Sequence, residues 1–353
     1  MQRINREEFL NELELAQPGL ATREIIEQSS CFVFKDNRVL TFNDEVACSL
    51  KSKLKITGAV RAAPLLSILR KMNEDEVEVE VVGGALRIKG KRREAGVVLE
   101  AEVQLPVDRI DVPDKWKPLA PEVVEAIKLA QHCASNDESN FELTCVHLHP
   151  KWIEACDSFQ LTRVKCKSGI SAPTLVRRDA LKHIVSLDVN EFAETEAWLH
   201  FRNATGLVLS CRRYNETYPD VSALLKFEGK PLTIPKGLKD AADKAAVFSS
   251  EAVTSNDVLV ELRPGKVRVQ GRGASGWYRE IKKIVYDGPP IAFSIAPELL
   301  MEITEKHNDA EIAEGKLRIR GERWVCIVCL SVPEEDSPEK QDSEDEKEEG
   351  DEE

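Results

Sequence analysis

The chain has 353 residues, of which 42% are hydrophobic, and it carries a formal net charge of −13 at pH 7. This length is enough for two or three domains with ordinary hydrophobic cores. No run of about 18 apolar residues occurs, so we expect no membrane-spanning helix. The charged, amphipathic beginning of the chain lacks the apolar stretch of a signal peptide, and we therefore expect a cytoplasmic protein.

The negative charge is concentrated at one end of the sequence. Residues 334–353 contain thirteen Asp and Glu against only Lys340 and Lys347, which leaves the rest of the chain nearly neutral. A charged segment without apolar residues is typical of disorder, and we assign residues 333–353 to an acidic tail. Such a tail either acts as a solubility tail or competes electrostatically for basic surface on the rest of the chain.

Taken in chain order, the predicted elements repeat three times. A helix is expected from Asn5, from Pro121 and from Pro235, and these starts lie 116 and 114 residues apart. Asn5 followed by Glu8 is similar to a capping box, and proline is tolerated in a first helical turn. A hairpin pattern, a second helix and a second strand pair follow each time. The hairpins span 31–42, 141–164 and 257–281, the second helices 61–73, 177–188 and 296–308, and the strand pairs 76–90, 196–213 and 310–331.

This self-similarity predicts a protein of the α+β class with three repeated domains, each of helix, strands, helix and strands. The predicted domain boundaries are 1–116, 117–231 and 232–332.

The third hairpin contains Gly271, Gly273 and Gly276 in the spacing GxGxxG. A dinucleotide site requires a strand before these glycines and a helix after them, so that the pyrophosphate meets the helix N-terminus. Here strand-like residues follow, without a helical period of apolar residues. Glycines of a hairpin turn are the better interpretation, and a nucleotide-binding oxidoreductase is a remote alternative.

The nine cysteines do not indicate a disulfide framework, because their number is odd and they are spread along the chain. Cys326 and Cys329 lie in an apolar run that is typical of a buried strand, where residues three apart point to opposite faces. His147 and His149 could share a strand face, but no third ligand accompanies them. We expect no metal, no cofactor and a reducing compartment.

No catalytic motif stands out, so the repeated units favour a scaffold over an enzyme. Charge on the predicted helices is more informative. Arg178 and Lys182 are neighbours one turn apart, with Arg177 beside them. In the third repeat Lys236, Lys239 and Lys244 are predicted to lie on one side of the helix, where Asp240 and Asp243 reduce the positive charge. In the first repeat the corresponding side is acidic, with Glu7 and Glu14. The helices present either ordinary solvated faces or a modestly basic surface that contacts phosphates without reading bases.

Four strings in this order resemble segments of the bacterial-type sliding clamp, the β subunit of DNA polymerase III. They are ACDSFQLTRV at 155–164, VRRDALKHIVSL at 176–187, YPDVSALL at 218–225 and WVCIVCL at 324–330. The resemblance covers about residues 1–332. It implies a head-to-tail homodimer that closes a ring around duplex DNA, with helices inside and sheets outside. It also implies that polymerase and clamp loader attach through a short peptide between domains 2 and 3.

The resemblance carries three sets of residues over to this chain. The peptide pocket would involve Leu143, Cys156, Ser158, Phe159, Gln160, Leu161, Pro219, Ala223, Leu224, Ile327, Cys329 and Leu330. The DNA-facing candidates are Arg23, Arg177, Arg178, Lys182, Lys236 and Lys239, and the candidates for the dimer interface are Ile110, Val247 and Phe248.

Two departures from the family pattern affect the expected function. The family's Gly-His-Arg is here Ser158-Phe159-Gln160, which removes positive charge from the pocket and adds an aromatic ring. The acidic tail is an addition to the family's length. We predict a non-catalytic DNA sliding clamp, and the alternative is a clamp-like partner-binding protein that does not encircle DNA.

Overall fold

The computed structural model describes residues 1–110, 113–226, 228–250, 256–306, 309–313 and 315–331. Within these ranges one order of elements, a strand, a helix and a three-stranded meander, occurs six times, twice in each repeat. The α+β class and the three repeated domains are therefore confirmed, whereas the boundaries 1–116, 117–231, 232–332 and 333–353 stay predictions.

The first domain contains two such units. The first is β1 (Gln2–Asn5), α1 (Arg6–Leu15), β2 (Cys31–Lys35), β3 (Arg38–Phe42) and β4 (Val46–Lys51), and the second is β5 (Gly58–Arg61), α2 (Ala62–Lys71), β6 (Glu76–Val82), β7 (Ala85–Lys89) and β8 (Glu94–Glu100). The Asn5 side chain accepts a hydrogen bond of 2.9 Å from the Glu8 backbone N–H, which confirms the predicted helix start.

The second domain repeats the order. Its elements are β9 (Lys117–Pro118), α3 (Pro121–Gln131), β10 (Cys145–His149), β11 (Trp152–Cys156) and β12 (Gln160–Lys165), then β13 (Thr174–Arg177), α4 (Arg178–Ser186), β14 (Val189–Glu194), β15 (Trp198–Asn203) and β16 (Val208–Arg212). A short helix α5 (Ser222–Leu225) lies in the connection to the third domain.

The third domain contains β17 (Lys230–Thr233), α6 (Lys239–Ser249), β18 (Val258–Arg263), β19 (Lys266–Gly273) and β20 (Gly276–Lys283), then β21 (Ile291–Ile295), α7 (Pro297–Lys306), β22 (Asp309–Ala313), β23 (Lys316–Arg320) and β24 (Trp324–Ser331). The expected helix start at Pro235 is wrong by four residues. Gly237 has a φ of 79°, in the left-handed region, so the chain turns there and α6 begins at Lys239.

The GxGxxG glycines belong to a hairpin, as predicted. Gly273 pairs with Gly276 at the turn between β19 and β20, and the chain continues as a strand. Gly271 is required for another reason, because a Cβ atom there would lie 1.9 Å from the Ala245 carbonyl oxygen of α6. The glycine therefore allows helix α6 to approach the sheet closely.

The predicted opposite orientation of Cys326 and Cys329 is also confirmed. Cys326 is buried and Cys329 is exposed on β24, so the two thiols lie on opposite faces. No group of three potential metal ligands occurs among the residues described above. Over the same residues, no helix is both long and apolar enough to cross a membrane.

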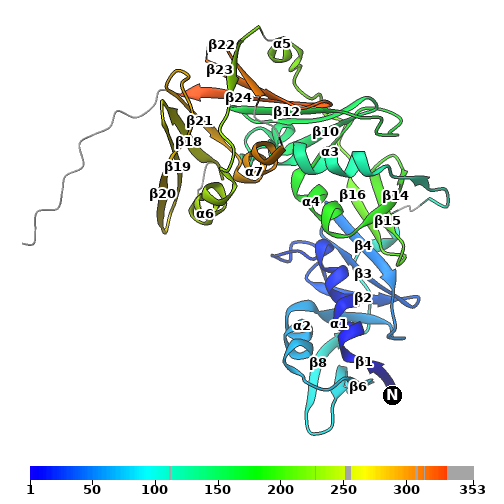
Figure 1. Cartoon of the computed structure of the whole chain (residues 1–353). Helices are drawn as coiled ribbons and strands as arrows, with labels where there is room; N and C mark the ends of the chain where they lie inside the picture. The colour runs from blue at the N-terminus through cyan, green and yellow to red at the C-terminus, as the bar shows by residue number, and fades with distance from the viewer. Residues whose placement is uncertain (111–112, 227, 251–255, 307–308, 314, 332–353) are drawn as a thin grey trace, which may run out of the picture.

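The strands form two twelve-stranded sheets that cross the domain boundaries. Strand β4 of domain 1 pairs antiparallel with β16 of domain 2, and β12 of domain 2 pairs antiparallel with β24 of domain 3. Figure 1 shows the three domains as a crescent, with α2, α4, α6 and α7 on the concave side and β14 and β15 on the convex side.

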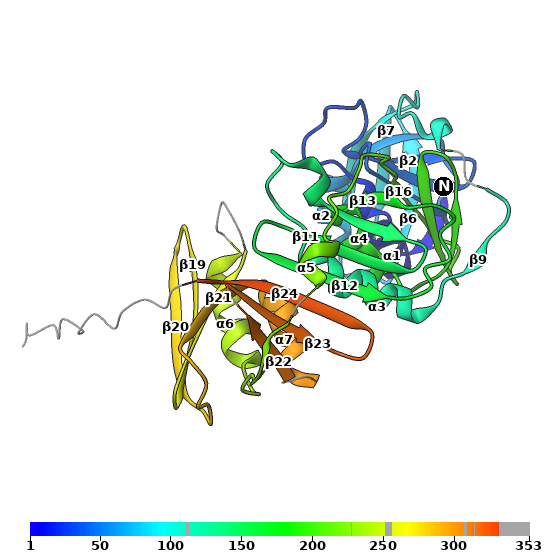
Figure 2. The ribbon, with the colours of Figure 1, turned by 90° about the horizontal axis from the view of Figure 1, so that it is seen from above.

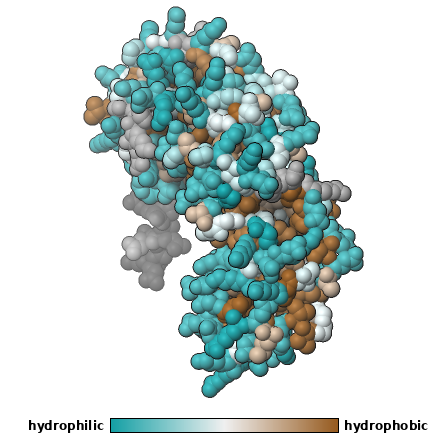
Figure 3. All heavy atoms as spheres, turned by 90° about the vertical axis from the view of Figure 1, so that its right-hand side faces the viewer, coloured by the Kyte–Doolittle hydropathy of each residue, from teal (hydrophilic) through white to brown (hydrophobic). Residues whose placement is uncertain are grey.

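The hydrophobic core lies between helices and sheets. Phe9 and Leu13 of α1 and Leu65 and Leu69 of α2 are fully buried against strand residues such as Phe34. Viewed from above, β20 lies at the outer edge of domain 3, beyond α6 and α7 (Figure 2). The convex side is largely hydrophilic, and hydrophobic side chains gather over the lower part of the molecule (Figure 3).

Candidate functional site

Each domain contributes a pair of helices, and α2, α4, α6 and α7 lie on the concave side of the crescent. In each domain the two helices pack against each other, α1 on α2, α3 on α4 and α6 on α7. Their apolar sides are buried on the sheets, so their exposed side chains point away from the sheets. Any ligand inside the crescent would meet these exposed side chains first.

Arg177, a DNA-facing candidate, is buried at the boundary between domains 1 and 2. Its Nη2 lies 2.5 Å from Glu138 Oε1, and its Nε lies 3.6 Å from Glu45 Oε1. The Glu138 carboxylate raises the pKa of the Arg177 guanidinium, and Arg177 in turn lowers the pKa of Glu138. Arg177 is therefore engaged mainly by Glu138 within domain 2, reaches Glu45 of domain 1 only as an ion pair, and is largely buried from a ligand.

The other DNA-facing candidates are more accessible. Arg178 is half-buried, and its Nη1 donates a hydrogen bond of 2.6 Å to the Ala134 carbonyl oxygen. Lys182 is exposed and lies 3.2 Å from Asp179. Arg23 is exposed and lines, together with Lys182, a surface hollow of about 940 Å³ between domains 1 and 2.

Lys236 and Lys239 are both exposed. Lys236 precedes α6, which begins at Lys239, so the predicted helical arc of Lys236, Lys239 and Lys244 is wrong.

The second candidate region is the groove between domains 2 and 3. Cys156, Leu161 and Ile327 form a buried apolar cluster with Val221, and Leu143 and Leu225 pack at its edge. The Tyr218 hydroxyl anchors the adjoining loop, because it accepts a hydrogen bond of 2.8 Å from the Cys156 N–H and lies 3.2 Å from the Cys156 sulfur. Tyr218 and Val221 belong to the cluster but were missed from the sequence, although they flank the predicted Pro219.

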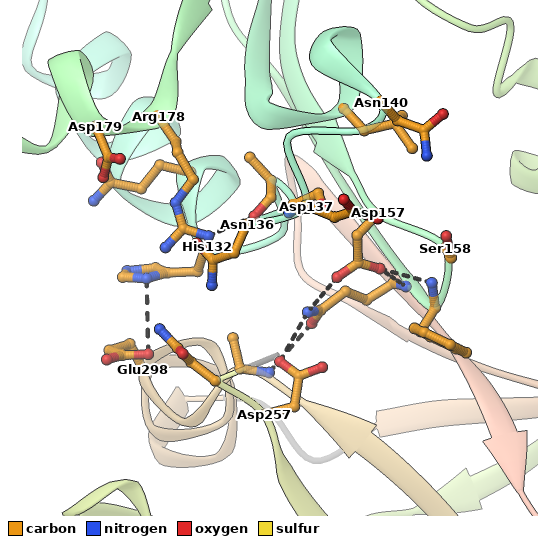
Figure 4. A pocket seen from close by; sticks show the side chains of 18 of the residues that line it. His132, Asn136, Asp137, Asn140, Asp157, Ser158, Arg178, Asp179, Asp257 and Glu298 are labelled. Atoms are coloured by element: carbon orange, nitrogen blue, oxygen red, sulfur yellow. Dashed lines mark hydrogen bonds and ion pairs between the residues drawn. The ribbon is translucent and has the colours of Figure 1, made fainter. Parts of the chain in front are cut away.

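A cavity of about 560 Å³ opens beside this cluster (Figure 4). Of the predicted pocket residues, Leu143, Ser158, Phe159 and Gln160 line it. Pro219, Ala223, Leu224, Cys329 and Leu330 are exposed or half-buried around the buried cluster, and Leu224 is 39% exposed. The structure thus brings the predicted pocket residues together at one boundary between domains.

Gln160 takes a different role from the one expected of a peptide contact. Its side-chain N–H groups donate to Asp157 Oδ2 at 3.0 Å and to Asp257 Oδ1 at 3.1 Å. Its Oε1 accepts a hydrogen bond of 3.2 Å from the Ala296 N–H at the start of α7. Gln160 is only 4% exposed, so it links domain 2 to domain 3.

Phe159 remains available at the rim, because 59% of its surface is exposed. Its N–H donates to Asp157 Oδ1 at 2.6 Å, and its carbonyl oxygen accepts from the Cys329 N–H at 2.8 Å. These bonds fix the backbone, so the ring is held as an exposed apolar contact before any ligand arrives.

The third region consists of the two ends of the crescent, where β8 and β20 lie (Figure 1). In the described part of the chain, β20 pairs only with β19, and Glu94–Val98 of β8 pair only with β7. Apolar side chains are exposed on both strands, with Val98 at 69%, Trp277 at 57% and Ile281 at 58%.

The predicted interface residues lie near these ends to different degrees. Phe248 is half-buried at the end of α6, where its ring would lie 3.1 Å from a Cβ atom placed on Gly276 of β20. Val247 is 63% exposed. Ile110 packs on a small cluster that includes Val33 and Phe42 of domain 1 and Trp198 of domain 2, so it lies toward the boundary between these domains. Their contact with a second subunit stays a prediction.

No protein-family model matches the sequence, and no curated protein is similar to it. Solved structures do match it over nearly the full length. The DNA polymerase III β subunit of Thermotoga maritima is 13% identical with a TM-score of 0.68, and that of Streptococcus pneumoniae is 15% identical with a TM-score of 0.69, each covering 94% of this chain and 99% of the other.

This chain has the sliding-clamp fold. The β subunit of Pseudomonas aeruginosa gives the same result, with 14% identity, a TM-score of 0.64 and coverage of 93% of this chain and 99% of the other. At identities this low the agreement concerns the sliding-clamp fold, and function has to be argued from this chain's own surfaces.

Proposed function

We propose that this protein is a DNA sliding clamp, a non-catalytic, ring-shaped processivity factor that acts in the cytoplasm. Two copies would join head to tail around duplex DNA and tether a replicative polymerase. The observation that supports this best is the pair of open strand edges, β8 and β20. They are the counterparts of the strands that join the domains within the chain.

Within the chain, the last strand of a domain's first meander joins the last strand of the next domain's second meander. This is true of β4 with β16 and of β12 with β24. Strand β20 ends the first meander of domain 3, and β8 ends the second meander of domain 1. A second copy placed head to tail would therefore join β20 to β8 and continue the same rule, and contacts of this kind close into rings.

The internal boundaries also predict the register of this contact. Ser49 pairs with Val208 and Arg163 pairs with Val325 across the two boundaries. Ser49 lies two residues before Lys51, the last residue of β4, and Arg163 lies two residues before Lys165, the last residue of β12. The last residue of β20 is Lys283. Val208 and Val325 are the first paired residues after the turns of the hairpins β15–β16 and β23–β24. Glu94 holds this position in the hairpin β7–β8, so it is the counterpart of both. Ile281 would then face Glu94, and Trp277 would face Val98.

This register buries apolar surface that the single chain leaves exposed. Val82, Ala85 and Val98 lie opposite one another on adjacent strands, and Val82 is 47% exposed. Trp277 would extend this row across the boundary. Aromatic side chains opposite β-branched ones stabilise sheets by roughly 0.2–1 kcal/mol per pair, beyond the gain from burying Trp.

The groove between domains 2 and 3 supplies the second part of the proposal. A polymerase or clamp loader would insert a short peptide whose apolar anchor contacts Phe159, Leu224 and the buried cluster around Cys156 and Ile327. Such anchors are the usual centres of binding energy at interfaces. Because Gln160 is occupied by Asp157 and Asp257, Phe159 would be the main contact from the 158–160 segment.

The experiment that tests the proposal combines solution mass with retention on DNA. Light scattering should give about twice the chain mass of 39.5 kDa. Dimers placed on nicked circular DNA should remain bound through gel filtration and should leave when the circle is cut. A dimer that leaves intact circles as fast as linear DNA would contradict the clamp proposal.

A second candidate is a clamp-like partner-binding protein that does not encircle DNA. It is favoured by one observation, the excess of carboxylates on the concave helices. In that case the peptide groove would bind its partner, while no topological retention on circular DNA would be measured.

A further inference from the structure

In domain 1 the segment that follows the last strand folds back over the domain's own first meander. Residues 103–110 come after β8 and pack on β2 and β3, on the outer face of the sheet, which points away from the helices. Leu105 is only 3% exposed there, and Asp108 forms an ion pair of 2.9 Å with Lys35 of β2. This covering segment therefore makes both apolar and charged contacts with the outer face.

Domain 2 repeats this arrangement. Residues 218–225 come after β16 and form the covering segment on the outer face of β10, β11 and β12. The Tyr218 ring stacks on His147 of β10 with 4.9 Å between the ring centroids, and Val221 is buried in one cluster with Cys156 of β11. In both domains the segment after the last strand thus covers the first meander.

The outer face of the first meander of domain 3 is strongly basic. Val260, Val267 and Val269 are buried beneath α6, so their neighbours along β18 and β19 point away from the helices. The strand register places six basic residues on this outer face, namely Arg263, Lys266, Arg268, Arg272, Arg279 and Lys283. The one carboxylate that these strands place there, Glu261, is 2% exposed and is paired with Arg268.

Three of these cations are available to an anionic ligand. Arg272, Arg279 and Lys283 are exposed, and no carboxylate of the described chain forms an ion pair with them. Lys266 and Lys283 lie directly opposite each other on β19 and β20, and like charges in this position destabilise a sheet. An acidic segment on this face would offset the repulsion between them.

The segment that follows β24 carries the complementary charge. Residues 334–353, which lie outside the described residues, contain thirteen Asp and Glu against two Lys. Ser331 at the end of β24 lies opposite Ala292 of β21, and this row of paired residues continues across β18 and β19 to Ile281 of β20. The row crosses about four strand spacings, roughly 19 Å. Because an extended chain spans about 3.3 Å per residue, the segment is long enough to reach every strand of the basic face.

We propose that the acidic segment 334–353 binds the basic outer face of β18, β19 and β20 in its own chain. It would take the place that the covering segments take in domains 1 and 2, with its carboxylates on Arg272, Arg279 and Lys283. The bound segment would keep other polyanions, nucleic acid included, off this face. The inference goes beyond the proposed clamp function and does not depend on ring formation, because the face and the segment belong to one chain.

The first test locates the segment in the full-length protein. A water-soluble carbodiimide joins a lysine amine to a carboxylate in contact with it, and mass spectrometry of the resulting peptides identifies the pair. We expect links from Lys266 and Lys283 to carboxylates of 334–353 at low salt, and their loss at 1 M NaCl, where the Debye length is about 3 Å.

Two results of this experiment would overturn the proposal. The first is a segment that links mainly to lysines elsewhere, such as Lys239 on the concave side. The second comes from a mixture of isotope-labelled and unlabelled protein. If the links to Lys266 and Lys283 joined labelled to unlabelled chains, the face would bind the segment of a second copy.

The second test measures what the segment keeps away from the face. A full-length variant in which every Asp and Glu of 334–353 is changed to its amide removes the charge without shortening the chain. Since three exposed ion pairs together shift an equilibrium by about tenfold, this variant should bind a linear duplex about tenfold more tightly in fluorescence anisotropy at low salt. Adding Arg272→Glu, Arg279→Glu and Lys283→Glu to it should abolish the gain.

A matched control makes the same charge change elsewhere on the chain. Lys71→Glu, Lys91→Glu and Arg92→Glu alter three exposed cations of domain 1, and added to the amide variant they should leave most of the gain in place. Equal losses from the two triple variants would show that net charge alone controls duplex binding and would overturn the proposal. An amide variant without any gain would overturn it as well.

Discussion

The boundaries between domains within the chain and the open edges at its ends are formed by equivalent strands. They differ in the side chains that lie beside these strands. At the internal boundaries polar side chains cross from one domain to the next. Examples are Gln160 to Asp257 and Arg212 to Asp44. At β8 and β20 apolar side chains are exposed instead, namely Val98, Trp277 and Ile281.

This difference has a functional consequence. Exposed strand edges are normally blunted because they invite pairing with another chain. An edge that keeps an apolar row and matching register is suited to a specific partner, which in the proposed ring is a second copy. Because the two strands of this boundary would belong to separate chains, it is the boundary that we expect to open in the proposed ring.

The largest effect is expected at the open edge. Trp277→Asp would place a carboxylate opposite Val98 and Ala85, where it loses water without gaining a partner. We expect the dimer Kd to rise about 100-fold, roughly 3 kcal/mol, with unfolding of the monomer unchanged. Analytical ultracentrifugation measures the first quantity and urea denaturation the second.

The control for that variant is Val285→Asp, at a fully exposed valine beyond the end of β20. It adds the same negative charge without touching the edge, so the dimer Kd should stay within a factor of two. Similar weakening by both variants would show that net charge, and not the β8–β20 contact, controls dimerisation.

At the boundary between domains 2 and 3, Gln160→Leu should destabilise the protein by about 1–3 kcal/mol. The change leaves Asp157, Asp257 and the Ala296 N–H without their buried hydrogen-bond partner. The midpoint of urea unfolding measures the effect, and the exposed neighbour Ser158→Ala serves as the control. If the Gln160→Leu variant were as stable as wild type, the hydrogen bonds of Gln160 would not stabilise the boundary between domains 2 and 3.

At the boundary between domains 1 and 2, Arg177→Met should lower stability by about 1–3 kcal/mol through the lost hydrogen bonds to Glu138 and Thr144 and the lost ion pair with Glu45. The same variant should bind linear duplex with unchanged salt dependence, since Arg177 is buried. A reduced salt slope in anisotropy titrations would restore Arg177 to the DNA-facing set.

The smallest predicted effect is on stability at acidic pH, and it concerns His183 at the boundary between domains 1 and 2. Burial, with a further contribution from Lys182, lowers the pKa of His183 to about 4. Its neutral form is therefore favoured in the folded protein, so the stability it contributes is complete above pH 6.5 and is lost as pH falls toward 4. His183→Asn should flatten this part of the curve of unfolding free energy against pH. A curve of unchanged shape would exclude His183 as the group responsible.

The repeats, the hairpins and the helices could be predicted from the sequence because they depend on neighbours in the chain. Asp36 and Asn37, with positive φ angles of 52° and 56°, form the turn of the predicted hairpin 31–42, and Asn5 caps α1 through a residue three positions away. The opposite faces of Cys326 and Cys329 follow from strand geometry alone. The acidic tail, 333–353, lies outside the described residues, so its competitor role stays a prediction.

Tertiary structure alone decided what the polar residues do and which edges stay open. The Gln160 side chain reaches Asp257, which is 97 positions away, and Arg212 reaches Asp44, which is 168 positions away. No local pattern marks such partners, so the sequence did not indicate that Arg177 is buried against Glu138 or that Gln160 bonds to Asp257. Similarly, every meander ends in a similar strand, and only the packing of three domains in one chain leaves one edge of β20 and of Glu94–Val98 in β8 unpaired among the described residues.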